Sequence, residues 1–120
     1  MGNKTLIIGA SSNSERYSYK AAEKLLQHHH EIYMIGNRPG VLFNHEIINE
    51  QMAFPDVDTV TMYVSAKNQK GYYDYITGLK PRRVIFNPGT ENPEFAKHLE
   101  LHGISAEEAC TLVLLATEVY

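Results

Sequence analysis

Small and polar residues follow the first apolar run of the chain. Thr5 to Ile8 are β-branched or aliphatic, and the residues directly after them are Gly9, Ala10, Ser11, Ser12 and Asn13. A strand that turns at a glycine into a helix leaves the first helical N–H groups free to bind an anion. This order predicts a phosphate-binding turn, with an ordinary strand-to-helix turn as the alternative. Neither G-x-G-x-x-G nor the P-loop ending G-K-[ST] is present.

Two arginines stand near predicted strand ends. Arg16 lies just beyond the turn, and the second apolar run ends in Gly36, Asn37 and Arg38. NAD-binding domains normally carry Asp or Glu at the end of this strand, where it holds the ribose hydroxyls. An arginine there better suits a ribose with an extra phosphate, as in NADP or coenzyme A, because guanidinium binds phosphate through paired hydrogen bonds. A solvated loop residue is the alternative for Arg38.

Aromatic residues and a second turn supply further candidate ligand contacts. Tyr63 ends the third predicted strand and is placed to stack on an adenine or to line a pantetheine channel, with core packing as the alternative. Tyr19, like Tyr17, lies beside the phosphate turn, where one of them can cover a ligand. The fourth strand leads into a loop expected to form a type II turn or a plain turn, made of Pro88, Gly89 and Thr90.

Candidates for catalysis and metal binding are few. His28, His29 and His30 are consecutive, so on a helix they point about 100° apart and cannot all face one ion. Cys110 opens the last predicted helix, where the helix dipole can lower the pKa of a thiol, but burial as a small apolar side chain is favoured. We therefore predict no metal site and no catalytic residues.

Length and charge limit the classes of function. The chain has 120 residues, a formal net charge of −3 and one cysteine. This length fits a single domain over residues 1–120 without a separate substrate domain. The charge gives no reason to expect nucleic acid or an anionic membrane as a partner, while a homo-oligomer or a protein partner stays open. The apolar runs are too short to span a bilayer and the start Met-Gly-Asn-Lys lacks a signal-peptide apolar region, so we expect a cytoplasmic protein.

Short apolar runs alternate with segments of helical periodicity, which predicts an α/β fold. We expect strands over 4–9, 31–36, 58–64, 82–87 and 104–106, and helices over 17–29, 67–79, 92–102 and 108–118. Ser14 or Ser18 is expected to cap the first helix, and Glu91 or Asn92 the third. Residues 39–57 are expected to cross the surface with a short edge strand over 46–48. Together, these strands and helices predict one Rossmann-like, doubly wound, five-stranded parallel sheet in the order 3-2-1-4-5, with helices on both faces.

The motifs resemble those of the CoA-binding domain family, small Rossmann proteins related to the CoA-binding module of the alpha subunit of succinyl-CoA synthetase. The likeness extends through the loop at 84–92 and the segment at 103–110, and the family's opening pattern is matched in order by Gly9, Ala10, Ser11, Arg16 and Ser18. The resemblance implies a coenzyme A ligand whose pyrophosphate lies over Gly9 to Asn13, with Arg16 nearby.

Two departures from the family pattern fall on the ribose side of the expected site. The family usually has Asn-Pro at the end of its second strand, where this chain has Gly36-Asn37, and Asn44 stands where a glycine is usual before the edge strand. We therefore expect the pyrophosphate turn to follow the family more closely than the recognition of adenine and the 3′-phosphate.

These residues favour non-catalytic binding of coenzyme A, or of an acyl-CoA, at the carboxyl edge of the sheet. An NADP-binding enzyme or redox protein is the first alternative, which Arg38 permits and the missing substrate domain disfavours. A protein-interaction module with a vestigial nucleotide cleft is the second. A mixed disulfide between Cys110 and coenzyme A is a related hypothesis.

Overall fold

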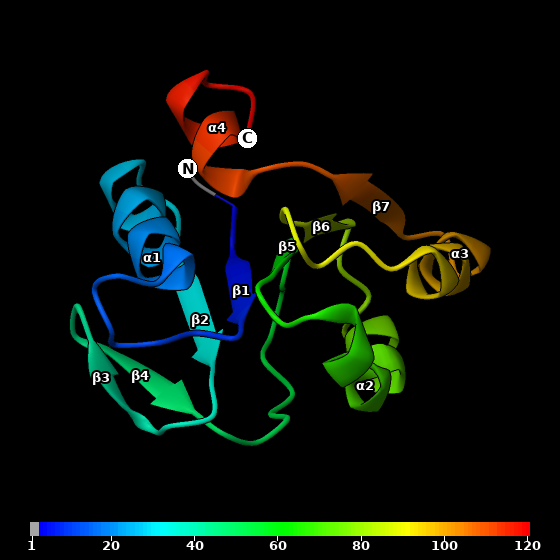
Figure 1. Ribbon diagram of the computed structural model, residues 1–120, viewed down its shortest axis with the longest axis horizontal. Helices are drawn as coiled ribbons and strands as arrows, with labels where there is room; N and C mark the ends of the chain where they lie inside the picture. Colours follow the sequence, from blue (N-terminus) through cyan, green and yellow to red (C-terminus); the bar gives the residue numbers. More distant parts are fainter. Residues whose placement is uncertain (1–2) are drawn as a thin grey trace.

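Within residues 3–120, the part of the chain that the computed structural model describes, seven strands form one sheet (Figure 1). The strands are β1 (Thr5–Ile8), β2 (Ile32–Ile35), β3 (Gly40–Leu42), β4 (His45–Ile48), β5 (Thr59–Met62), β6 (Arg83–Phe86) and β7 (Ser105–Glu108). Their order is β3-β4-β2-β1-β5-β6-β7, and only β3 and β4 run antiparallel. Met1 and Gly2 lie outside the described residues. They are the first two residues of the predicted domain and of the start predicted to lack a signal peptide.

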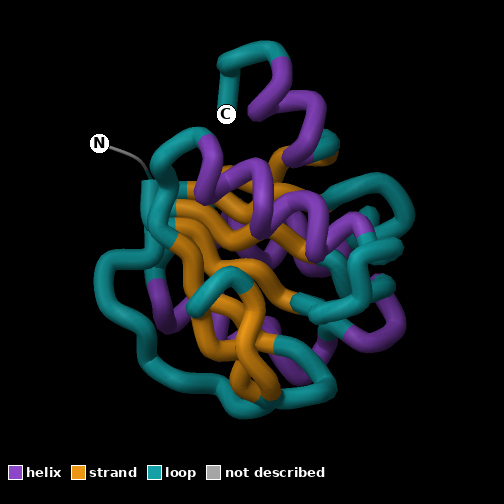
Figure 2. The backbone as a smooth tube through the Cα atoms, turned by 90° about the vertical axis from the view of Figure 1, so that its left-hand side faces the viewer, coloured by secondary structure: helices purple, strands orange, loops and turns teal. Residues whose placement is uncertain are grey.

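Helices cover both faces of this sheet (Figure 2). They are α1 (Tyr17–Gln27), α2 (Tyr73–Leu79), α3 (Pro93–Leu101) and α4 (Thr111–Ala116), and the 3-10 turns η1 (Ala66–Asn68) and η2 (Lys70–Tyr72) precede α2. Figure 1 shows α1 and α4 on one side of the sheet and α2 and α3 on the other. The predicted α/β, Rossmann-like architecture with helices on both faces is confirmed.

The predicted five-stranded, all-parallel sheet in the order 3-2-1-4-5 is wrong. The third predicted strand, β5, pairs with β1 on the side away from β2, in the register Thr5↔Thr59. The place beside β2 belongs to β4, in the register Met34↔Ile47. Residues 39–57 do not merely cross the surface, because β3 and β4 form a hairpin that the buried side chain of Ile47 anchors to the core.

The turn of this hairpin uses left-handed backbone conformations. Phe43 and Asn44 join β3 to β4 with positive φ angles of 52° and 63°. Two-residue hairpin turns of this kind require the left-handed region, which Asn tolerates better than most residues with a side chain. Asn44 is therefore suited to its position in the turn.

Two helix boundaries and one cap also differ from expectation. The helix predicted over 67–79 is regular only from Tyr73, and the helix predicted over 108–118 begins at Thr111 because β7 continues through Glu108. Neither Ser14 nor Ser18 caps α1, whose N-cap residue is Arg16 without a side-chain hydrogen bond. Asn92 does cap α3, where its Oδ1 accepts from the N–H of Phe95 at 3.1 Å.

Apolar side chains from β1 pack against both helical layers. Leu6 and Ile8 face the cluster that contains Phe95 of α3, whereas Ile7 faces the cluster that contains Leu25 of α1. A parallel strand covered on both faces is mainly apolar, as β1 is from Leu6 to Ile8. This packing fixes the end of β1 at the middle of the sheet's carboxyl edge, where the polar turn begins.

Candidate functional site

A pocket of about 450 Å³ lies at the carboxyl edge of the sheet, between the turn after β1, the start of α1 and the loops after β5 and β6. Its volume is within the range of small-molecule sites. The residues that line it are Gly9, Glu15, Arg16, Tyr17, Ser18, Tyr63, Ser65, Pro88, Gly89 and Thr90. Three segments far apart in the sequence thus share one hollow, as expected where parallel strands end together.

The structure brings together about half of the residues singled out in the sequence. Lining the pocket are Gly9, Arg16, Ser18, Tyr63, Pro88, Gly89 and Thr90. Outside the lining are Ala10, Ser11, Ser12, Asn13, Tyr19, Gly36, Asn37 and Arg38. Of the two tyrosines beside the turn, Tyr17 faces the pocket, whereas Tyr19 packs on Phe43 with ring centroids 5.1 Å apart. Glu15 and Ser65 were not foreseen, since nothing in their local sequence marks them as lining residues.

Glycine is required at the end of β1 by a close backbone approach. Gly9 has a φ of +94°, and a Cβ at this position would lie 2.9 Å from the carbonyl carbon of Tyr63. Only glycine combines this conformation with that contact at low cost. The absence of a side chain at Gly9 therefore lets the loop after β5 close against the turn and complete the pocket wall.

Some backbone N–H groups of the turn donate hydrogen bonds within the protein, and others are available to a ligand. The N–H groups of Gly9 and Ala10 both donate to the carbonyl of Ile35 at 2.9 Å. The N–H of Asn13 donates to the Ser11 hydroxyl at 3.0 Å. Among residues 3–120, the N–H groups of Ser11 and Ser12 have no hydrogen-bond partner, so these two can serve an incoming anion. The donors to a phosphate thus lie two and three residues beyond Gly9.

The start of α1 adds positive potential beside these amides. The N-cap residue Arg16 is extended, with φ −82° and ψ 142°, and its own side chain makes no capping hydrogen bond to the helix. The guanidinium of Arg16 is exposed and makes no ion pair with any carboxylate of the described part of the chain. A free cation at an uncapped helix N-terminus, on the wall of a pocket, is suited to binding an anionic group.

Tyr63, directly after β5, contributes an aromatic side chain to the pocket lining. Burial raises the pKa of Tyr63 to about 12, and the neighbouring hydroxyls of Thr61 and Thr111 only partly oppose this effect. The phenol therefore stays neutral at physiological pH, and the side chain presents an aromatic surface rather than a charge.

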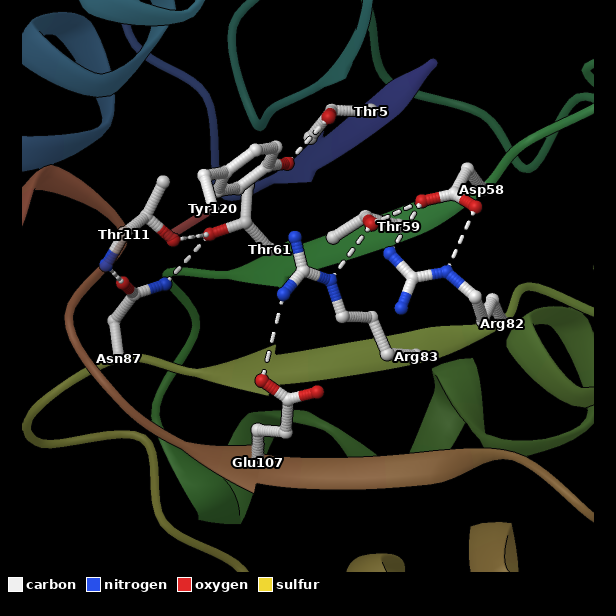
Figure 3. Close-up of polar contacts among 10 residues, drawn as sticks. All are labelled: Thr5, Asp58, Thr59, Thr61, Arg82, Arg83, Asn87, Glu107, Thr111 and Tyr120. Carbon is white, nitrogen blue, oxygen red and sulfur yellow. Dashed lines mark hydrogen bonds and ion pairs between the residues drawn. The ribbon is translucent and has the colours of Figure 1, made fainter. Parts of the chain in front are cut away.

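Asn87, directly after β6, is the centre of a buried group of hydrogen bonds (Figure 3). Its Nδ2 donates to Thr61 Oγ1 at 2.7 Å and to the carbonyl of Met62 at 2.9 Å, while its Oδ1 accepts from the N–H of Thr111 at 2.9 Å. The side chain is 2% exposed, so one amide joins β5, β6 and α4 in the interior. The sequence placed Asn87 at a strand end, but no local pattern distinguishes a buried amide from a solvated one.

The end of β2 lies on the other side of β1 from this pocket. Gly36 is buried against the turn, whereas Asn37 and Arg38 are exposed. Arg38 makes no ion pair with a carboxylate among residues 3–120. The two arginines therefore flank the end of β1, one on the helix side of the pocket and one beyond β2.

Other candidate groups lie apart from the pocket lining. Cys110 is a free, half-buried thiol at the N-cap of α4. In the described residues no three His, Cys, Asp or Glu side chains are grouped so that they can hold a metal ion. None of the helices in that part of the chain has the length and apolar character needed to cross a bilayer.

Sequence comparison decides the family. The family model described as a CoA binding domain matches residues 3–116, nearly the whole chain. The chain belongs to the CoA-binding domain family. The motifs at Gly9–Ser11, Arg16 and 84–92 that resemble this family lie within the matched region. No curated protein matches the chain.

Solved structures of similar proteins share the fold of this CoA-binding domain. The crystal structure of an uncharacterized protein is 46% identical, covers 100% of this chain and 99% of its own, and has a TM-score of 0.97. A Thermus thermophilus protein, the cell-free ID.343, is 16% identical with a TM-score of 0.87, over 99% of this chain and 91% of its own. A hypothetical protein from Pyrococcus horikoshii OT3 is 21% identical with a TM-score of 0.85, over 98% of this chain and 84% of its own.

Proposed function

We propose that the protein binds coenzyme A, or an acyl-CoA, without catalysing a reaction on it. The observation that carries the proposal is the unpaired guanidinium of Arg16 at the uncapped start of α1, on the wall of the pocket. Membership of the CoA-binding domain family supports the ligand class. In this arrangement the pyrophosphate lies over the turn after β1 and accepts hydrogen bonds from the amides of Ser11 and Ser12 and from Arg16.

The positions of the two arginines suggest a direction for the ligand. Arg38, beyond β2, is the cation placed to meet the 3′-phosphate of the nucleotide. The pantetheine arm then runs the other way, into the pocket between Tyr17, Tyr63 and the loop after β6. The lining there combines aromatic and small polar groups, which suits a chain of amide and methylene units.

The chemistry of the lining favours binding over catalysis. Glu15 is the carboxylate among the lining residues, and Tyr63 keeps its proton at physiological pH. No hydrogen bond within the described residues joins a lining nucleophile to a base, an arrangement that nucleophilic catalysis normally uses. The proposed role is therefore to hold or carry the ligand.

Calorimetric titration with coenzyme A and with dephospho-CoA tests the proposal. We expect saturable heat with both ligands and weaker binding of dephospho-CoA, because it lacks the 3′-phosphate assigned to Arg38. Absence of both heat and a thermal shift at millimolar coenzyme A contradicts the proposal.

NADP is the second candidate ligand, since an exposed Arg38 at the end of β2 suits a 2′-phosphate as well as a 3′-phosphate. The change in NADPH fluorescence on adding protein distinguishes it from coenzyme A. A protein-interaction role is favoured only by the exposed apolar residues Val113 and Val119 around α4. Light scattering over a range of concentrations tests self-association through that surface.

A further inference from the structure

A buried glutamine lies between the two loops that form the far side of the pocket. Gln69, at the junction of η1 and η2, is 0% exposed. Its Nε2 donates to the carbonyl of Val64 and to the carbonyl of Thr90, both at 2.8 Å. Its Oε1 accepts from Nδ2 of Asn92 at 3.0 Å. Both donor hydrogens of the amide are thus used to join the loop after β5 to the loop after β6.

Two of the three partners of Gln69, Thr90 and Asn92, make further hydrogen bonds. The N–H and the hydroxyl of Thr90 donate to the carbonyl of Asn87 at 2.9 and 2.7 Å. Asn92 donates to the hydroxyl of Tyr73 at 3.0 Å while it caps α3. The glutamine is therefore the central member of a buried polar network, and removal of its side chain leaves buried carbonyls unpaired.

Both loops contribute residues to the pocket lining. Tyr63 and Ser65 flank Val64 in the loop after β5, and Pro88 and Gly89 precede Thr90 in the loop after β6. The carbonyls of Val64 and Thr90 accept hydrogen bonds from the same nitrogen atom, so Gln69 holds the two loops at a fixed spacing.

We propose that Gln69 is a positioning residue that fixes the loops after β5 and β6 relative to each other, and thereby the affinity for the part of the ligand that contacts these two loops. The assignment of that part as pantetheine rests on the proposed function. The role of Gln69 in joining the two loops does not rest on the proposed function.

Two substitutions test whether Gln69 joins the two loops. Gln69→Glu keeps the shape but places a carboxylate, which has no N–H to donate, against two carbonyl oxygens. Gln69→Met keeps the length and removes all three hydrogen bonds. The matched control is Thr59→Val, which is equally buried at the opposite edge of the sheet and loses hydrogen bonds to Asp58 and Arg83.

Binding is measured well below the melting temperature with coenzyme A and with 3′,5′-adenosine diphosphate, which lacks the pantetheine arm and one phosphate of the pyrophosphate. We expect both Gln69 variants to bind coenzyme A on the order of tenfold more weakly and 3′,5′-adenosine diphosphate within about twofold of wild type. Thr59→Val should bind both ligands as wild type does. Equal losses for the two ligands, or no loss, overturn the proposal, because a merely structural role cannot discriminate between them.

Amide hydrogen exchange supplies a readout without ligand. The N–H of Thr90 should exchange faster in Gln69→Met than in wild type, and should be unaffected by Thr59→Val beyond the change in global stability. If the protection of the Thr90 N–H against exchange is unchanged in Gln69→Met, Gln69 does not join the two loops as proposed. If the wild-type protein binds no coenzyme A, the proposed function fails, and this exchange measurement alone decides whether Gln69 positions the pocket.

Discussion

Gly36 lies so close to Ala10 that a Cβ at position 36 would be 2.2 Å from the carbonyl oxygen of Ala10. The end of β2 and the turn after β1 are therefore in backbone contact, and this contact sets where the phosphate-binding turn sits. The close contact with Ala10 leaves no room for a side chain at position 36 in this structure.

Replacement of Gly36 by alanine should destabilise the protein and displace the turn. We expect a loss of about 1–3 kcal/mol in the free energy of unfolding, because the added methyl meets backbone that cannot rotate away. Urea unfolding measures the loss. Gly40→Ala is the control, since a Cβ there meets nothing within 4 Å and should change stability by less than about 0.5 kcal/mol. Equal effects at both positions refute the steric explanation.

Replacement of Arg16 by alanine should weaken coenzyme A binding without changing stability. The side chain is exposed and unpaired among residues 3–120, so only the ligand loses a partner, at a cost of about 1–3 kcal/mol for a charge-assisted contact. The difference between wild type and variant should shrink as salt concentration rises. Lys24→Ala removes the same charge from the other end of α1 and should bind nearly as wild type. Calorimetry at two salt concentrations is the measurement.

Replacement of Asn87 by alanine should be strongly destabilising. The change removes three buried hydrogen bonds and leaves the N–H of Thr111 and the carbonyl of Met62 without that partner, which predicts a loss of about 2–4 kcal/mol. Asn68→Ala removes one exposed hydrogen bond to Ser65 and should cost less than about 0.5 kcal/mol. A small loss in the free energy of unfolding for Asn87→Ala, measured by urea unfolding, would show that these hydrogen bonds contribute little to stability.

The acid sensitivity of stability should include a contribution from Asp58. Burial alone raises the pKa of this carboxyl, but hydrogen bonds from Arg82 and Thr59 outweigh it and lower the pKa below its usual value. A depressed folded-state pKa means stability that is present above the unfolded pKa and lost as pH falls through the folded value. The ion pair is largely exposed, so the contribution should be below about 1 kcal/mol.

Urea midpoints of wild type and Asp58→Asn between about pH 3 and 6 measure this contribution. The gap between the two proteins should close as the pH falls below about 4. A gap that is independent of pH contradicts the assignment.

The sequence was sufficient for the layers of the fold and for the turn after β1. Alternating apolar and helical segments predict a parallel sheet covered on both faces, and Gly9 marks a true close approach. The strand order failed at residues 39–57, where the hairpin depends on left-handed conformations at Phe43 and Asn44, and only Asn44 signals such a turn. Without β4 as a neighbour for β2, the predicted sheet placed β5 on the wrong side of β1.

The residues that hold the pocket in shape were the hardest to foresee. Gln69 and Asn87 lie among loop and strand-end residues whose polar character indicates solvent exposure. Both are buried because distant backbone groups surround them, and such long-range contacts leave no periodic trace in the sequence. Pro88 and Gly89, in contrast, carry their turn propensity locally and were foreseen.

Titration of the wild-type protein with coenzyme A, beside the Arg16→Ala variant, tests the central claim most directly. The account predicts saturable binding to the wild type, and binding to the variant that is weaker by about five- to 150-fold at low salt, with unchanged melting temperatures. Absence of wild-type binding at millimolar coenzyme A, or equal affinity for the two proteins, contradicts it.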